Sequence, residues 1–135
     1  MAREPNIEKI IQKYASRLSR LIHVDSIILT GSRARGDELK TSDIDLLVVS
    51  PDLEGMDTGQ RLQLLAKAWK EEKIGLTVEA IGYTKKEIKK MQKTSLYVKD
   101  ALRYGKVISL HARKGSRVSA RPRSHKPSLR LQALL

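Results

Sequence analysis

Hydrophobic positions recur at helical spacing near the start of the chain. Between Ile7 and Ile22, apolar side chains return every three or four residues, and lysines and arginines lie between them. This period places the apolar residues on one face of an α-helix. Pro5 suits a helix start, because its fixed φ is compatible with the first turn. We therefore predict an amphipathic helix of about four turns that begins near Asn6.

Shorter runs of aliphatic and β-branched residues predict the strands. Three of these runs, bounded by Gly, Pro or Ser, lie at 26–30, 44–49 and 76–81. Apolar runs of this length are typical of strands in a buried sheet. Residues 107–110 are apolar enough to add a fourth strand.

Between the strands, the pattern predicts three further helices. Thr58 is a candidate N-cap for the first of them. Its predicted apolar face consists of Leu62, Leu65, Ala66 and Trp69. Thr84, with Glu87 three residues later, matches a capping box at the start of a short helix. The pattern of residues 94–104 predicts the last helix, which ends at Gly105.

Strands that alternate with helices indicate an α/β or α+β domain, which we place at residues 1–110. We expect Tyr14, Trp69 and Tyr97 to lie in its core, since each follows an apolar face. Residues 111–135 are rich in Arg, Ser and Pro and show no apolar period, so we predict a disordered, basic tail.

The composition excludes several classes of protein. The chain has no Cys, which rules out a disulfide scaffold, a thiolate nucleophile and a cysteine zinc site. No apolar run approaches the roughly 20 residues that a membrane helix needs. The first residues lack the apolar stretch of a signal peptide. We therefore expect a cytoplasmic protein with no membrane partner.

The net charge of +12 suggests a nucleic acid as partner. Residues 111–135, however, hold seven of the 27 basic residues and none of the 15 acidic ones. More than half of the excess charge therefore belongs to the tail, which has no aromatic side chain on which bases could stack. Nucleic-acid binding through this tail, aided by the lysine-rich segment 85–93, stays an alternative.

The stretch between the first two predicted strands carries the candidate chemistry. Gly31 and Ser32 directly follow a strand, where a turn can bring backbone N–H groups close to a phosphate. Arg33 and Arg35 supply charge suited to the oxygens of a triphosphate. An ordinary turn with solvated arginines is the alternative interpretation.

Asp43 and Asp45 lie two residues apart on the second predicted strand, so both carboxylates leave the same face. Mg²⁺ binds hard oxygen ligands together with substrate phosphates, and a paired-metal site can activate an attacking oxygen and stabilise the leaving one. A phosphate-binding turn beside two aspartates predicts nucleotidyl or phosphoryl transfer. The alternative is an Asp-x-Asp turn that only begins a strand.

The pattern of Gly-Ser, ten residues and Asp-x-Asp resembles the signature of the nucleotidyltransferase superfamily related to DNA polymerase beta. The fuller string GSRARG…SDIDLLV resembles the minimal nucleotidyltransferases (MNT proteins). Residues 97–108 are similar to the ending typical of these small domains. The resemblance implies an α+β fold with a small mixed sheet of three to five strands. Its helices would pack on one face, and the other face would be open as a cleft.

The same resemblance implies the activity and the site. A nucleoside monophosphate, AMP if the donor is ATP, would pass to an acceptor with pyrophosphate leaving. Asp43 and Asp45 would hold Mg²⁺ in a two-ion site, and Gly31, Ser32 and Arg33 would position the phosphates. Glu79 matches a third acidic residue that acts as metal ligand or general base, although the family usually has Asp there.

Small MNT proteins resemble the antitoxins of toxin–antitoxin pairs whose partner is a helical HEPN ribonuclease, which implies AMPylation of that partner. Two alternatives stay open: a nucleotidyltransferase directed to nucleic acid, and a non-catalytic binding module of the same fold. The sequence does not determine the oligomeric state.

Overall fold

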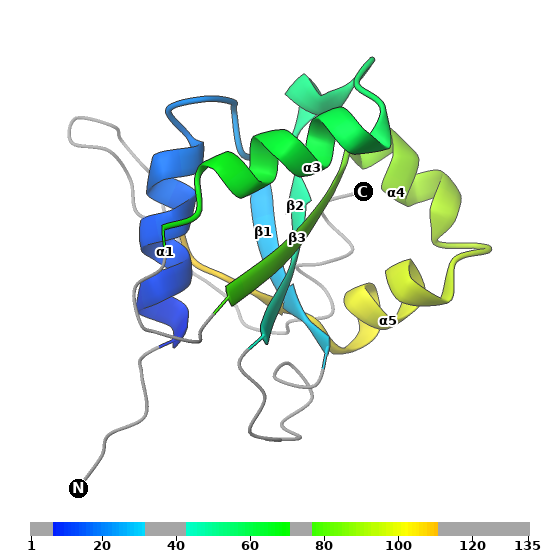
Figure 1. Ribbon diagram of the computed structural model, residues 1–135. Coiled ribbons are helices and arrows are strands. Elements are labelled where there is room, and N and C mark those ends of the chain that lie inside the picture. The colour runs from blue at the N-terminus through cyan, green and yellow to red at the C-terminus, as the bar shows by residue number, and fades with distance from the viewer. Residues whose placement is uncertain (1–6, 32–42, 71–76, 111–135) are drawn as a thin grey trace, which may run out of the picture.

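The structure is a computed structural model that describes residues 7–31, 43–70 and 77–110. Its helices and strands, shown in Figure 1, are α1 (Ile7–Leu18), β1 (Ser26–Thr30), β2 (Asp43–Val49), the 3₁₀ turn η1 (Pro51–Leu53), α3 (Thr58–Lys67), β3 (Thr77–Tyr83), α4 (Lys85–Met91), α5 (Leu96–Tyr104) and β4 (Lys106–Val107). The predicted tail at 111–135 lies outside the described residues. Within those residues, every helix is too short or too polar to cross a membrane.

The four described strands form one mixed sheet in the order β3-β2-β1-β4. β1 pairs antiparallel with β2 and with β4, whereas β2 and β3 run parallel. This confirms the predicted α+β class and the small mixed sheet. β4 contains only Lys106 and Val107, so the predicted fourth strand exists but is shorter than the apolar run.

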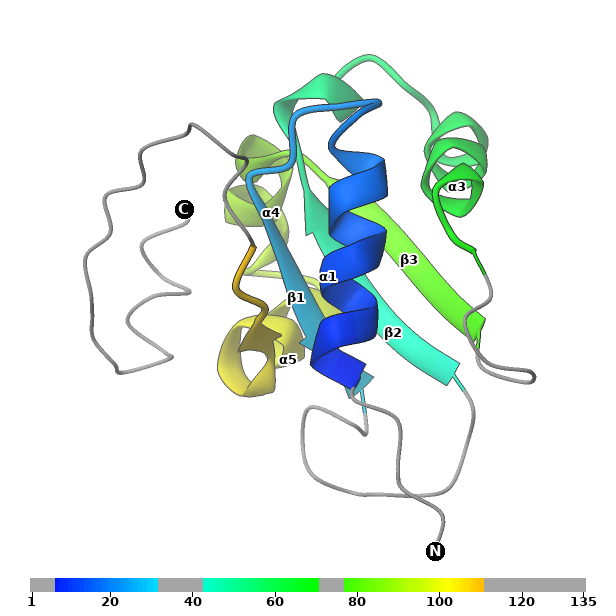
Figure 2. The same ribbon diagram turned by 90° about the vertical axis from the view of Figure 1, so that its left-hand side faces the viewer.

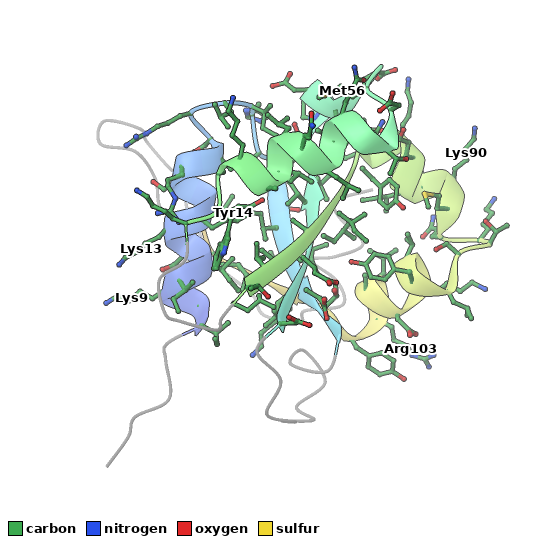
Figure 3. The ribbon with its side chains drawn as sticks, viewed as in Figure 1. Lys9, Lys13, Tyr14, Met56, Lys90 and Arg103 are labelled. Carbon is green, nitrogen blue, oxygen red and sulfur yellow. The ribbon has the colours of Figure 1, made fainter. Side chains whose placement is uncertain are left out.

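One face of the sheet is covered by α1 and α3, which the side chains of α1 hold together. The Tyr14 hydroxyl donates to the Leu65 carbonyl at 2.6 Å, and Arg17 Nε donates to the Ala68 carbonyl at 2.8 Å. The Tyr14 ring also meets Trp69 edge-on, with centroids 5.9 Å apart. Figure 3 shows Tyr14 on the inner side of α1, with Lys9 on its outer side. These bonds satisfy carbonyls at the end of α3, which the helix itself leaves without partners.

The other face of the sheet is covered by α4 and α5, as Figure 2 shows. The buried residues of this second core are Ile28, Leu47, Val49, Ile88, Val98 and Ala101. Helices therefore cover both faces of the sheet and not one face only, as was predicted, and the second face keeps a pocket beside α5. β1 and β2 are apolar on both faces, and a sheet of that kind needs cover on both.

The start and the buried face of α3 differ from the prediction. Asp57, not Thr58, is the N-cap, and it forms a capping box with Gln60. Leu62 is 48% exposed, whereas Arg61 is 9% exposed. Arg61 donates to both carboxylate oxygens of Glu87, at 2.8 and 2.9 Å, and to the Met56 and Gly82 carbonyls. These bonds compensate the cost of burying a charged side chain.

Glu87 also forms the predicted capping box of α4 with Thr84, so one side chain joins α3 to the start of α4. The hydrogen bonds from Arg61 hold the pKa of Glu87 below its ordinary value. A carboxylate with a lowered pKa in the folded state adds stability above its unfolded pKa. That stability is lost as the pH falls through the folded pKa.

Glu87→Gln is expected to lower the free energy of unfolding at pH 7 by about 1–2 kcal/mol, because Arg61 loses its charged partner. The Gln oxygen can still accept from the Thr84 backbone N–H. The difference between the variant and the wild type should shrink at pH 3, below the ordinary pKa of a glutamate, because the unfolded wild type has then taken up a proton that must be released to form the ion pair. Urea unfolding at both pH values measures this difference in the free energy of unfolding. Glu8→Gln is the control, because Glu8 is exposed, and it should change the free energy of unfolding by no more than about 0.5 kcal/mol. A deficit that is equal at pH 7 and pH 3 would contradict the role of the charge.

Candidate active site

Three carboxylates gather where β2 and β3 begin and β1 ends. Asp43 and Asp45 lie on one face of β2, the face that α5 partly covers, and Asp45 is in register with Glu79 of the parallel strand β3. Neighbouring strands lie about 4.8 Å apart, so Glu79 stands directly beside Asp45. The Thr77 hydroxyl, on the same face, donates to Asp43 Oδ1 at 2.9 Å. The structure therefore places Asp43, Asp45 and Glu79 on one face of the sheet, at the same end of two neighbouring strands.

Gly31 lies immediately above this cluster. Its φ of +73° is in the left-handed region, which favours glycine. A Cβ atom at this position would stand 2.5 Å from Asp45 Oδ2, closer than any normal contact. The chain therefore passes over the Asp45 carboxylate at a distance that only glycine allows. The approach predicted for Gly31 is to a phosphate and stays a prediction, whereas the observed close approach is to the Asp45 carboxylate.

The opposite wall of the site comes from α5, a helix that was predicted but not as part of the site. Tyr97 packs against the second core, as expected, and it also lines a pocket together with Thr30, Gly31, Asp45 and Glu79. The hydroxyls of Tyr97 and Thr30 are 3.3 Å apart, and Thr30 Oγ1 donates to the Asp45 carbonyl at 3.3 Å. Burial raises the pKa of Tyr97, and the negative charge of Asp45 adds to the rise, so the phenol keeps its proton at neutral pH.

Asp100 and Tyr104 also line this pocket, and neither was recognised from the sequence. A signal was available, because positions 97, 100, 101 and 104 recur at helical spacing. The predicted helix therefore presents one mixed polar and aromatic face. Without knowledge of the tertiary packing, that face cannot be assigned to the site rather than to solvent.

The remaining predicted residues, Ser32, Arg33 and Arg35, lie outside the described residues. Of the predicted phosphate-binding turn, only Gly31 can be placed. Among residues 7–31, 43–70 and 77–110, no group of three acidic or histidine side chains is close enough to enclose a metal ion. Asp43 and Asp45 leave the same face of β2. Two carboxylates are a donor set that suits Mg²⁺, which proteins usually bind through one or two carboxylates plus the phosphates of the substrate.

Comparisons with known proteins identify the fold and the family of the chain. A "putative nucleotidyltransferase" from Sulfolobus solfataricus has the same fold, with a TM-score of 0.52 and 22% identity over 67% of this chain and 84% of that chain. A crystal structure of a toxin-antitoxin with AMP-PNP has a TM-score of 0.45 and 19% identity, covering 74% of this chain and 73% of that chain. No curated protein matches significantly. The model of the nucleotidyltransferase domain family matches residues 7–108. The chain therefore belongs to the nucleotidyltransferase domain family, whose members transfer a nucleoside monophosphate to an acceptor.

Proposed function

We propose that this protein transfers AMP from ATP to a hydroxyl group of a partner protein, with Mg²⁺ held by Asp43 and Asp45. One observation carries the catalytic part of the proposal. Asp45 stands beside Asp43 on β2, in register with Glu79 and directly beneath Gly31. Carboxylates held this close repel one another unless a cation lies between them. The sequence predicts a turn after Gly31 whose backbone N–H groups would bind the phosphates of a nucleotide.

Each residue has a distinct role in the proposed reaction. Bound Mg²⁺ supplies the positive charge that polarises the phosphates and stabilises the oxygens of the attacking and leaving groups. Gly31, Ser32 and Arg33 position the β- and γ-phosphates, and Arg35 adds positive charge. Glu79 accepts the proton of the acceptor hydroxyl and completes the acidic site.

The reaction balances without any further reactant. The hydroxyl oxygen of the acceptor forms a bond to the α-phosphorus of ATP, and the bond from that phosphorus to the bridging oxygen breaks. Pyrophosphate leaves with the electron pair of the broken bond. The products are the AMP ester of the acceptor and pyrophosphate.

The acceptor is proposed from the resemblance of GSRARG…SDIDLLV to the minimal nucleotidyltransferases. That resemblance favours a tyrosine hydroxyl of a HEPN-type ribonuclease. A nucleic-acid acceptor, held by the basic residues 111–135, is the competing possibility and predicts RNA binding that weakens steeply with salt.

The test incubates the full chain and the product of its neighbouring gene with Mg²⁺ and ATP labelled on either the α- or the γ-phosphate. Label on the partner protein from α-labelled ATP alone supports the proposal. Label on added RNA alone would overturn the protein acceptor, and label transferred from the γ-phosphate would overturn nucleotidyl transfer. Asp52→Asn serves as the control variant, because this exposed carboxylate lies outside the pocket and contacts the His23 backbone.

A further inference from the structure

The pocket has two walls of different chemistry. The wall formed by the strands is acidic and suits a metal ion and phosphates, as described above. The wall formed by α5 presents Tyr97, Asp100, Ala101 and Tyr104, one face of a helix over about two turns. The two parts of a nucleoside triphosphate match these two walls, because its phosphates bind cations and its base binds an apolar or aromatic surface.

Tyr104 is the side chain on this wall that can receive a base. Most of the Tyr97 side chain is buried, and its hydroxyl lies 3.3 Å from that of Thr30. Tyr104, in contrast, is 48% exposed and still lines the pocket. The Arg103 guanidinium lies over the Tyr104 ring, 5.5 Å from its centroid. Figure 3 shows Arg103 at the lower edge of α5. A cation on one ring face stabilises the position of the tyrosine, and an aromatic ring binds any base by stacking.

Asp100 lies one helical turn before Tyr104 on the same face, and it is exposed in the pocket. A carboxylate only accepts hydrogen bonds, so it selects groups that donate them. The hydroxyls of ribose are such donors, and acidic side chains bind them in other nucleotide sites. Adjacent turns of α5 therefore offer a partner for a sugar and a platform for a base.

We propose that α5 is the nucleoside-binding wall of this site: Tyr104, backed by Arg103, stacks on the base of the nucleotide, and Asp100 accepts a hydrogen bond from its ribose. This inference rests on the proposed nucleotidyl transfer and adds the part of the substrate that the carboxylates and the glycine turn do not contact. It assigns recognition of the nucleoside to residues outside the Gly-Ser and Asp-x-Asp elements.

The test measures, by titration calorimetry in Mg²⁺, the binding of the full chain to ATP and to inorganic tripolyphosphate. The wild type should bind ATP at least tenfold more tightly. Tyr104→Ala should weaken ATP binding about tenfold and leave tripolyphosphate binding unchanged. Tyr104→Phe keeps the aromatic ring and should bind ATP as tightly as the wild type. Asp100→Asn should weaken the binding of ATP but not that of 2′,3′-dideoxy-ATP. Leu96→Ala is the matched control, because Leu96 is 74% exposed on the same helix and does not line the pocket.

The outcomes separate this inference from the function on which it rests. Equal binding of ATP and tripolyphosphate by the wild type would overturn the nucleoside wall and leave nucleotidyl transfer intact. A loss in Tyr104→Ala that affects both ligands equally would show a structural role and would also overturn it. The expected binding pattern without transfer of AMP would overturn the proposed function alone. Binding of neither ligand would overturn both.

Discussion

Asp45→Asn is expected to lower kcat for AMP transfer by about a thousandfold or more, which corresponds to about 4 kcal/mol of activation free energy. The substitution keeps the shape of the side chain and removes one negative charge at the point where β1, β2 and β3 meet. Asp45 is the carboxylate that lies under Gly31 and beside Glu79, so its loss removes the central ligand of the proposed metal site. Single-turnover kinetics with labelled ATP and the acceptor measures the effect.

The fold should survive this substitution, because Asp45 shares its strand face with Asp43 and has Glu79 beside it. Removing one of three like charges relieves repulsion in the absence of metal, so we expect the free energy of unfolding to stay within about 1 kcal/mol of the wild type or to rise. Mg²⁺ and ATP should raise the melting temperature of the wild type and of Asp52→Asn, but not that of Asp45→Asn. Wild-type turnover by Asp45→Asn would contradict the mechanism.

The parts of the fold that local sequence determines were predicted from it. The capping box of Thr84 and Glu87 and the end of α5 at Gly105 depend on residues close together in the chain. The resemblance implied helices on one face of the sheet only, whereas the apolar runs of β1 and β2 require cover on both faces. Those runs place Leu47 and Val49 on the second face, and this alone requires helices there. The burial of Arg61 depends on Glu87, 26 residues later, and no local pattern shows that pairing.

The candidate site was predicted only in part, because contacts between residues far apart in the chain do not follow from local sequence. Asp43 and Asp45 share a face because a strand has a period of two. Glu79 was a candidate only because the family resemblance implies a third acidic residue on a later strand. The register that sets Glu79 beside Asp45 is a property of the sheet. Tyr97 of α5 packs against the second core, as aromatic residues on apolar helix faces usually do, but its place in the pocket could not be predicted from local sequence. That helix in fact crosses the end of β1, where the apolar face reaches Thr30 and the carboxylates.

Gly31→Ala is expected to reduce AMP transfer at least a hundredfold, although it adds a single methyl group far smaller than any substrate. The new Cβ would stand 2.5 Å from Asp45 Oδ2, so either the carboxylate or the turn must move. A displacement of about 1 Å at a reacting centre can cost about a hundredfold in rate. The left-handed φ of Gly31 adds a backbone cost of about 1–2 kcal/mol for any residue with a Cβ.

Gly55→Ala separates these two effects. Gly55 has a φ of +85°, and a Cβ there meets nothing within 4 Å. It should therefore lose about 1–2 kcal/mol of stability for the same backbone reason but keep full activity. Urea unfolding and rates of AMP transfer for both variants, measured at a temperature where each is folded, make the comparison. If Gly31→Ala lost stability as Gly55→Ala does but kept wild-type transfer, the close approach to Asp45 would have no part in catalysis. A rate that falls only in Gly31→Ala would show that the reaction depends on the position of the Asp45 carboxylate beneath this turn.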